Sequence, residues 1–148
     1  MTRPTAKPPA EPAIIGWREH VCLPDLGNEE FVAKMDTGAE YCALHATGIR
    51  IRQNRVSFQL DSGKKLSAAL VREIEIKSSN GETSTRPLIR IRIMIGSRTI
   101  VSNVTLVDRS RMTEKMLLGR RLLRKRFIVD PRLSCELSQP GKKKKKPS

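Results

Sequence analysis

The first candidate for chemistry in this sequence is a carboxylate in a turn that follows an apolar segment. The stretch FVAKMDTGAEYCALHA, residues 31–46, runs from β-forming residues into Asp36-Thr37-Gly38-Ala39. Asp36 supplies a carboxylate, the Thr37 hydroxyl can lock the loop, and Gly38 permits a close approach of a second backbone segment. The alternative is a surface turn, because three short residues of these types recur by chance.

Hydrolysis by carboxylates requires two of them. One ionised oxygen takes a proton from water, while one protonated oxygen polarises the scissile carbonyl. The sequence contains a single Asp-Thr-Gly, so the second Asp36 has to come from a second copy of the chain. A two-fold axis through the loops sets the two carboxylates against each other, and they then share a proton. The motif therefore predicts a homodimeric aspartic peptidase.

Histidine and cysteine offer two alternatives to this dyad. The spacings His20-x-Cys22 and Cys42-x-x-His45 are compatible with a mixed thiolate–imidazole metal site, and Cys42 with His45 is a possible nucleophile and base. The sequence has no H-E-x-x-H helix, and DSGKKLS lacks the spacing of a phosphate-binding loop. We therefore expect no metal and no cofactor.

Most of the chain has the pattern of short strands separated by turns. Residues 14–23 and 29–35 flank a Pro24–Gly27 turn, and two further runs flank Asp61-Ser62-Gly63. Residues 72–108 alternate apolar and polar residues, with turns at 79–81 and 96–97. Only Gly119–Phe127 has helical spacing. The predicted fold class is all-β, closed or nearly closed, with one short C-terminal helix.

Length and composition indicate one domain with a tail at each end. The chain has 148 residues, which suffices for one core. We expect a disordered tail over residues 1–13, a folded domain over 14–139 and a disordered polylysine tail over 140–148. Of the formal charge of +14, five charges lie in Lys142–Lys146 and one in the N-terminal tail, which leaves +8 for the domain. The domain itself is therefore basic.

The expected location is the cytoplasm. No apolar run approaches the roughly 20 residues of a membrane helix, so no membrane contact is expected. Three cysteines cannot all pair within one chain and are too few for a disulfide scaffold. Reduced thiols fit a soluble, cytoplasmic protein.

A second motif supports the dyad. MLLGR, residues 116–120, places two bulky apolar residues before Gly119-Arg120 and the expected helix. Together with the Asp36 motif it resembles the retropepsin-like aspartic peptidases, and the resemblance spans residues 14–137. The blocks at Ala43–Ala46 and Leu118–Arg121 are most similar to a bacterial group named ATP-dependent zinc protease. That group is associated with processing of the glutamate tail of a small-subunit ribosomal protein. Residues 40–42 depart from its usual pattern.

The resemblance implies a retropepsin-like barrel that is active as a homodimer. Asp36, Thr37 and Gly38 would be catalytic, with Ala39 beside the substrate. The acid at Glu40 would pair with Arg120, as the equivalent residues do in retropepsins. The hairpin with Ser79, Asn80 and Gly81 at its turn lies where the retropepsin flap lies, so it is expected to cover the cleft. The alternative is an ordinary surface hairpin.

The basic residues point to an acidic partner. Ten arginines and lysines alternate with apolar residues along the expected strands: Arg50, Arg52, Arg55, Lys64, Lys65, Arg72, Arg86, Arg90, Arg92 and Arg98. A solvated basic surface is one interpretation. The other is that Arg72, Arg86, Arg90 and Arg92 bind a glutamate-rich substrate, with a possible contact to ribosomal RNA. A ribosome- or RNA-binding module without catalysis is the competing function, although five aromatic residues offer little base stacking.

Overall fold

The computed structural model describes residues 11–77 and 80–135. The elements in chain order are β1 (Ala13–Gly16), β2 (Arg18–Leu23), the 3-10 turn η1 (Pro24–Leu26), β3 (Glu29–Met35), β4 (Cys42–His45), β5 (Thr47–Arg52), β6 (Arg55–Gln59), β7 (Lys65–Ala69), β8 (Arg72–Lys77), β9 (Thr83–Ile95), β10 (Arg98–Val107), β11 (Met116–Leu118), α1 (Arg120–Leu123) and β12 (Phe127–Asp130). The prediction of an all-β fold with one short helix is confirmed.

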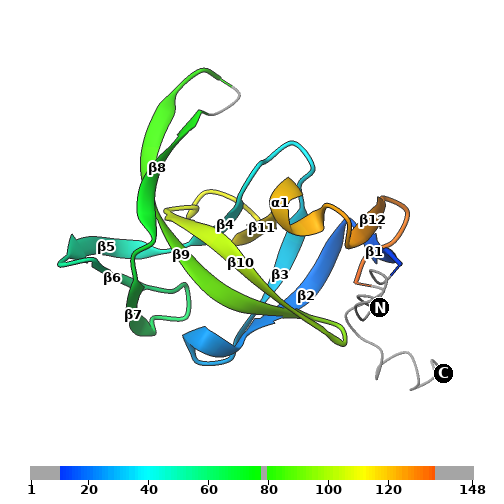
Figure 1. Ribbon diagram of the computed structural model, residues 1–148, viewed down its shortest axis with the longest axis horizontal. Helices are drawn as coiled ribbons and strands as arrows, with labels where there is room; N and C mark the ends of the chain where they lie inside the picture. The colour runs from blue at the N-terminus through cyan, green and yellow to red at the C-terminus, as the bar shows by residue number, and fades with distance from the viewer. Residues whose placement is uncertain (1–10, 78–79, 136–148) are drawn as a thin grey trace, which may run out of the picture.

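Six strands close into a barrel. Their order is β10-β4-β11-β3-β2-β9, and β9 pairs back with β10. Two neighbouring pairs within the ring are parallel, β10 with β4 and β11 with β3. Figure 1 shows β9 and β10 crossing the front of the barrel, with β2 and β3 behind them. The carboxyl ends of β3 and β11 therefore reach the same edge of the barrel.

The barrel core follows from alternation along the strands. In β9 the residues Ile89, Ile91, Ile93 and Ile95 are buried, while Arg90, Arg92 and Met94 between them are exposed. Successive side chains of a strand point to opposite faces, so this spacing turns one apolar face inward. Each fully buried isoleucine contributes roughly 1.5–3 kcal/mol relative to an exposed one.

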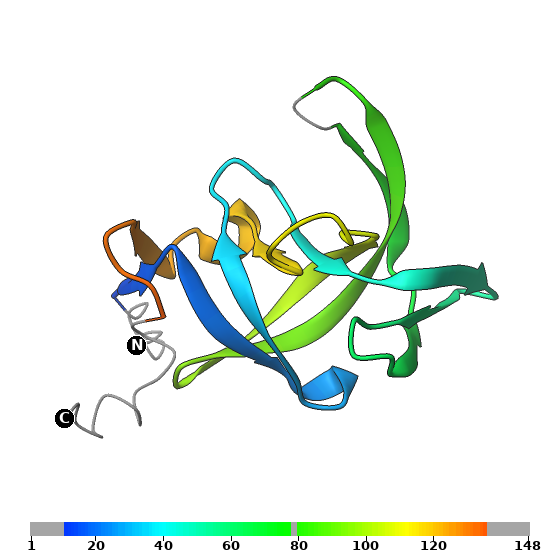
Figure 2. The ribbon, with the colours of Figure 1, turned by 180° about the vertical axis from the view of Figure 1, so that it is seen from behind.

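Three smaller units extend from the barrel. β8 pairs with the first half of β9 and forms a hairpin that projects away from the barrel. β5, β6 and β7 form a three-stranded sheet, and β1 pairs in parallel with β12. Figures 1 and 2 place the β1–β12 pair and the β5–β7 sheet at opposite ends of the molecule.

The helix is shorter than expected. α1 ends at Leu123, because Arg124 leaves helical geometry with ψ at 132° and Lys125 has a positive φ of 67°. The chain then turns so that Phe127 begins the pairing of β12 with β1. Tertiary strand pairing thus overrides the helical spacing seen as far as Phe127.

The ends of the chain bear on the predicted domain limits. β1 begins at Ala13, one residue before the predicted start of the domain. Residues 1–10 and 136–148 lie outside the described residues, and with them most of both predicted tails. In the part of the chain that the structure describes, no helix has the length and apolar character needed to cross a membrane.

Candidate active site

Asp36 lies immediately after β3, where the backbone of a second strand holds it. Its amide donates to the Leu118 carbonyl oxygen at 2.9 Å, at the end of the parallel β3–β11 ladder. The Asp36 Oδ1 atom accepts a hydrogen bond from the Gly38 amide at 2.9 Å, and the Asp36 carbonyl accepts one from Ala39 at 3.2 Å. The side chain is half-buried. A rigid strand end therefore fixes the carboxylate.

Gly119 lies in close backbone contact with the loop that follows Asp36. A Cβ atom on Gly119 would lie 2.5 Å from the Tyr41 carbonyl oxygen and 2.9 Å from that of Ala39. A Cβ on Gly38 would meet only the Asp36 Oδ1 atom, at 3.3 Å. The amides of the two residues after Gly119 donate to the Ala39 and Glu40 carbonyls at 2.7 and 3.1 Å. The late Gly-Arg segment thus packs directly against the Asp36 loop.

Two expected side-chain contacts in this loop differ from the structure. Glu40 pairs with Arg121, at 2.9 Å to Nη2 and 3.0 Å to Nε, instead of with Arg120. Arg120 donates from Nη1 to the Thr37 carbonyl at 3.2 Å. The Thr37 side chain is exposed, and its hydroxyl forms no hydrogen bond within the described residues. The direction of the side chains at the start of α1 selects Arg121 as the partner of Glu40.

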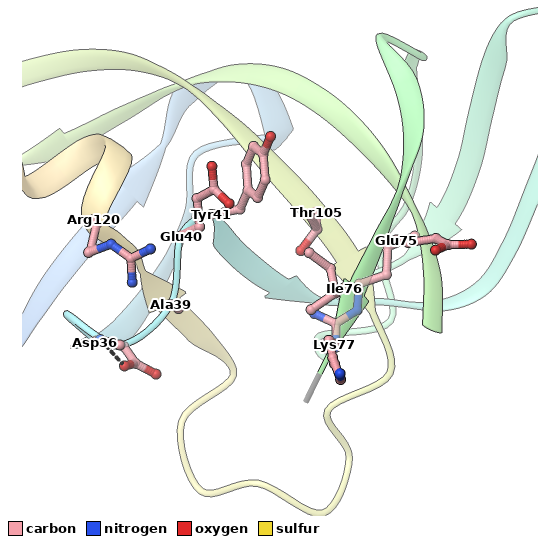
Figure 3. Close-up of a pocket in the computed structure, with 11 residues that line it drawn as sticks. Asp36, Ala39, Glu40, Tyr41, Glu75, Ile76, Lys77, Thr105 and Arg120 are labelled. Atoms are coloured by element: carbon pink, nitrogen blue, oxygen red, sulfur yellow. Dashed lines mark hydrogen bonds between the residues drawn. The ribbon is translucent and has the colours of Figure 1, made fainter. Parts of the chain in front are cut away.

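A cavity of about 500 Å³ opens beside Asp36. Figure 3 shows Asp36 on one side and Ile76 and Lys77 of β8 on the other. The lining residues come from the Asp36 loop, from β8 to β10 and from the start of α1: Asp36, Gly38, Ala39, Glu40, Tyr41, Glu75, Ile76, Lys77, Arg86, Thr105 and Arg120. This volume lies within the roughly 300–1,000 Å³ that ligand sites usually occupy.

The predicted flap borders this cavity through β8. Gly81 has a positive φ of 91°, as a tight turn requires, and Asn80 Oδ1 accepts a hydrogen bond from the Glu82 amide at 3.0 Å. Ser79, the third predicted flap residue, lies outside the described residues.

The four arginines predicted to bind substrate fall into two groups. Arg86 lines the cavity, and Arg72 is hydrogen-bonded to the Tyr41 hydroxyl at 3.4 Å, so it lies close to the cavity. Arg92 is held by Asp25 through an ion pair of 2.7 Å, and Arg90 donates to Asn103 at 3.4 Å. Neither Arg90 nor Arg92 is part of the cavity lining. Alternation along β9 points these two side chains away from the core on the outer face of the barrel.

Sequence reasoning missed Arg109. This half-buried residue follows β10, and the Asp36 carboxylate is one of its electrostatic neighbours. Burial lowers the pKa of the Arg109 guanidinium, while Glu114 and Asp36 oppose that shift. Burial also lowers the pKa of Arg86, and the charge of Arg109 lowers it further. The sequence carried no signal for Arg109, because its neighbours in space come from segments that are distant in the chain.

The alternative Cys42–His45 pair is not assembled. The buried Cys42 Sγ lies 3.9 Å from the Ser102 hydroxyl, and burial raises the pKa of this thiol. His45 Nδ1 instead accepts a hydrogen bond from the Arg109 amide at 2.8 Å. Among residues 11–77 and 80–135, no group of three or more metal-ligating side chains comes together. A thiol nucleophile with His45 as its base therefore has no support in the geometry.

Comparison with known proteins relates this chain to a peptidase family, to proteins named as ligases and to a solved structure. The family described as "Retropepsin-like aspartic endopeptidase RimB" matches residues 14–137. Two proteins named "Probable alpha-L-glutamate ligase" are also similar. The one from Desulfotalea psychrophila is 32% identical over 87% of this chain, and the one from Shewanella pealeana is 34% identical over 86%. The chain spans about 30% of the length of these curated relatives. A crystal structure of a Legionella pneumophila protein of unknown function has a TM-score of 0.71 and 28% identity, and the match covers 84% of this chain and 98% of that one.

Proposed function

Because the chain belongs to the RimB-like family of retropepsin-like aspartic endopeptidases, we propose that it hydrolyses peptide bonds with a pair of Asp36 carboxylates. The observation that carries the proposal is the placement of Asp36. It lies at the ends of two paired parallel strands and opens onto a cavity of about 500 Å³. In this mechanism one Asp36 takes a proton from the attacking water. The other, protonated, donates a hydrogen bond to the scissile carbonyl.

The second carboxylate requires a second copy of the chain. Two features of the surface support a dimer. Ile14 and Ile128 are paired across β1 and β12 and are 49% and 54% exposed. A hollow of about 350 Å³ is lined by the apolar side chains Leu123, Phe127 and Val129 and by Thr37, Arg120 and Arg124. We propose that the partner subunit covers these apolar residues and brings its own Asp36 to the two-fold axis.

We propose a glutamate-rich chain as the substrate. The cations Lys77, Arg86 and Arg120 line the cavity together with the acids Asp36, Glu40 and Glu75, and the three cations can contact the carboxylates of an acidic peptide. The relatives named glutamate ligase contain a segment like this chain within a longer protein. A peptidase that hydrolyses glutamate-rich chains is a chemical counterpart to a ligase that uses glutamate. The specific target we propose is the glutamate tail of a small-subunit ribosomal protein in the cytoplasm.

A non-catalytic RNA- or ribosome-binding module is the second candidate. It is favoured by exposed cations on β5 and β6, where Arg52 lies directly opposite Arg55. Like charges directly opposite each other repel and destabilise the strand pair, so a bound polyanion would reduce this repulsion. This function does not need the Asp36 carboxylate.

The Asp36→Asn variant separates the two candidates. The amide is nearly isosteric but cannot act as a base, so cleavage of a glutamate-rich peptide should be lost while the fold and the dimer persist. Mass spectrometry of the products and analytical ultracentrifugation are the measurements. Asp25→Asn is the matched control, because Asp25 pairs with Arg92 outside the cavity. Undiminished cleavage by Asp36→Asn would exclude the aspartic mechanism.

A further inference from the structure

The segment that runs from α1 to β12 carries a concentration of positive charge. Residues 120–126 have the sequence RRLLRKR. The two leucines are buried in the core, while Arg121, Arg124 and Lys125 are exposed. Figure 1 shows this segment beside the β1–β12 pair, away from the β5–β7 sheet. Burial of the leucines therefore leaves the charged side chains around them at one place on the surface.

Four cations of this segment line a single hollow of about 430 Å³, here called the basic hollow: Arg121, Arg124, Lys125 and Arg126. Among the described residues, its lining includes neither a carboxylate nor an apolar side chain. The cavity beside Asp36 differs in this respect, because Glu40 and Glu75 line it together with Asp36. The basic hollow therefore presents positive charge alone.

Local contacts hold two of these cations and leave the other two without a partner. Arg126 Nη1 donates to a carbonyl oxygen of α1 at 2.9 Å, and Arg121 is paired with Glu40. The side chains of Arg124 and Lys125 form no hydrogen bond and no ion pair with residues 11–77 or 80–135. Their charges are therefore available to a ligand.

Lys125 adopts a backbone conformation that favours glycine. Its φ is 67°, and it directly follows the last residue of the α1 C-cap. Glycine is common at this position of a helix end, because a Cβ atom is unfavourable in the left-handed region. The sequence thus places an ammonium group where the backbone alone would favour glycine, and strain of this kind is frequent at functional positions.

The hydrogen-bonding character of the lining indicates the kind of ligand. Guanidinium and ammonium groups only donate hydrogen bonds. A peptide brings its own backbone N–H donors, and the side chains of the basic hollow offer no acceptor for them. The phosphates of a nucleic-acid strand are permanently ionised and only accept, so they match a lining of donors.

We propose that the basic hollow binds the phosphate backbone of a nucleic-acid strand, with Arg124 and Lys125 contacting the phosphates. The site is separate from the Asp36 cavity and does not depend on the proposed peptidase function. It also lies apart from the exposed cations of β5 and β6. Since no aromatic side chain lines the hollow, bases have nothing there to stack on, and binding follows charge and not base sequence.

Fluorescence anisotropy with a labelled twelve-nucleotide oligouridylate tests the site. The double variant Arg124→Gln/Lys125→Gln loses two phosphate contacts, so its affinity at about 50 mM salt should fall roughly tenfold. The slope of log affinity against log salt should become shallower by about 1.4, the value for two contacts to a single strand. A twelve-nucleotide oligoadenylate should show the same losses.

A matched control removes the same charge elsewhere. Lys34→Gln/Arg90→Gln neutralises two exposed cations on barrel strands outside the basic hollow, and it should bind oligouridylate as the wild type does. Equal losses in the two double variants would overturn the proposal, because general charge would then explain the binding. An unchanged affinity of Arg124→Gln/Lys125→Gln would also overturn it.

Lys125→Gly separates the ammonium group from the backbone. Glycine relieves the positive φ, so this variant should have a Tm equal to or above that of the wild type and still bind oligouridylate more weakly. Lys125→Arg keeps the charge and should keep the affinity. A wild-type affinity of Lys125→Gly, or a weaker affinity accompanied by a lower Tm, would overturn the role of Lys125.

A labelled twelve-residue oligoglutamate distinguishes phosphates from carboxylates. Arg124→Gln/Lys125→Gln should bind it as the wild type does, and a loss as large as that for oligouridylate would overturn the proposal in favour of an acidic peptide. Arg124 also lines the apolar hollow that we assign to the partner subunit, so sedimentation velocity would compare the assembly of variant and wild type. If the assembly changes, the single variant Lys125→Gly decides, because Lys125 does not line that apolar hollow.

Discussion

The Asp36 loop and the loop that carries Arg109 are held by different kinds of bonds. Backbone hydrogen bonds to residues 118–121 fix the Asp36 loop, residues 36–41. The Arg109 loop, residues 108–115, is held largely by side chains. His45 accepts its Arg109 amide, and the Lys115 ammonium donates to three of its carbonyls at 3.0–3.4 Å. Figure 3 shows the Arg109 loop crossing below Asp36 and Lys77.

The difference explains which loop the sequence reveals. Close backbone contact restricts residue type, since Gly119 has no room for a Cβ, and this restriction appears as a motif. Many side chains can satisfy a loop carbonyl, so the Arg109 loop has no such signature. If the comparison is right, substitutions at the contact between the Asp36 loop and Gly119 act on folding, and those that free the Arg109 loop act on local order.

The largest effect is expected from Gly119→Ala. The added Cβ meets main-chain atoms of Tyr41 and Ala39, which cannot move without breaking the Asp36 loop. We expect a loss of about 2–3 kcal/mol in the free energy of unfolding, measured by urea denaturation. Gly48→Ala is the control, because its Cβ meets no atom within 4 Å and only its positive φ of 60° is unfavourable, at about 1 kcal/mol. Equal losses for the two variants would contradict the close approach.

Lys115→Met tests whether one ammonium organises the Arg109 loop. Three carbonyls lose their donor, so we expect a loss of about 1–2 kcal/mol and faster amide hydrogen exchange within residues 109–114. Protection of the Asp36 amide should not change, because its acceptor is the Leu118 carbonyl. Lys65→Met, an exposed lysine on β7, should alter neither region. Equally faster hydrogen exchange in both loops would contradict the difference between them.

His45 offers a smaller and more specific test. In His45→Asn the side-chain oxygen can replace Nδ1 as the acceptor of the Arg109 amide, whereas His45→Ala leaves that amide without a partner. We expect His45→Ala to be less stable than His45→Asn by about 1 kcal/mol. Thermal unfolding measures the difference. Identical behaviour of the two variants would show that the hydrogen bond does not position Arg109.

The smallest effect concerns a surface pair outside both loops. Hydrogen bonds from Arg132 lower the pKa of Asp130 from its usual 3.8 to about 2 in the folded protein. Because the folded pKa is depressed, the stabilisation is present above about pH 4 and is lost as the pH falls towards 2. Asp130→Asn should therefore lower Tm slightly at pH 6 and not at pH 2. A difference in Tm between the wild type and Asp130→Asn that grows as the pH falls would contradict this prediction.

Local patterns accounted for much of the fold. The hairpins around residues 61–63 and 96–97 and the alternation along β9 were predicted, because strand period and turn residues depend on near neighbours in the sequence. The helix was overestimated, since its end depends on the pairing of β12 with β1, which are distant in the chain.

The candidate site shows the same difference between local features and long-range contacts. The sequence by itself determined the Asp36 loop and the Gly119 segment, because a strand end, a tight turn and a backbone contact each restrict which residues fit. Only the tertiary structure decided the charge partners. Glu40 takes Arg121, and Arg92 takes an aspartate 67 residues away. Long charged side chains have many possible partners, and the partner that is reached depends on strand register and side-chain direction, which exist only once the barrel has closed.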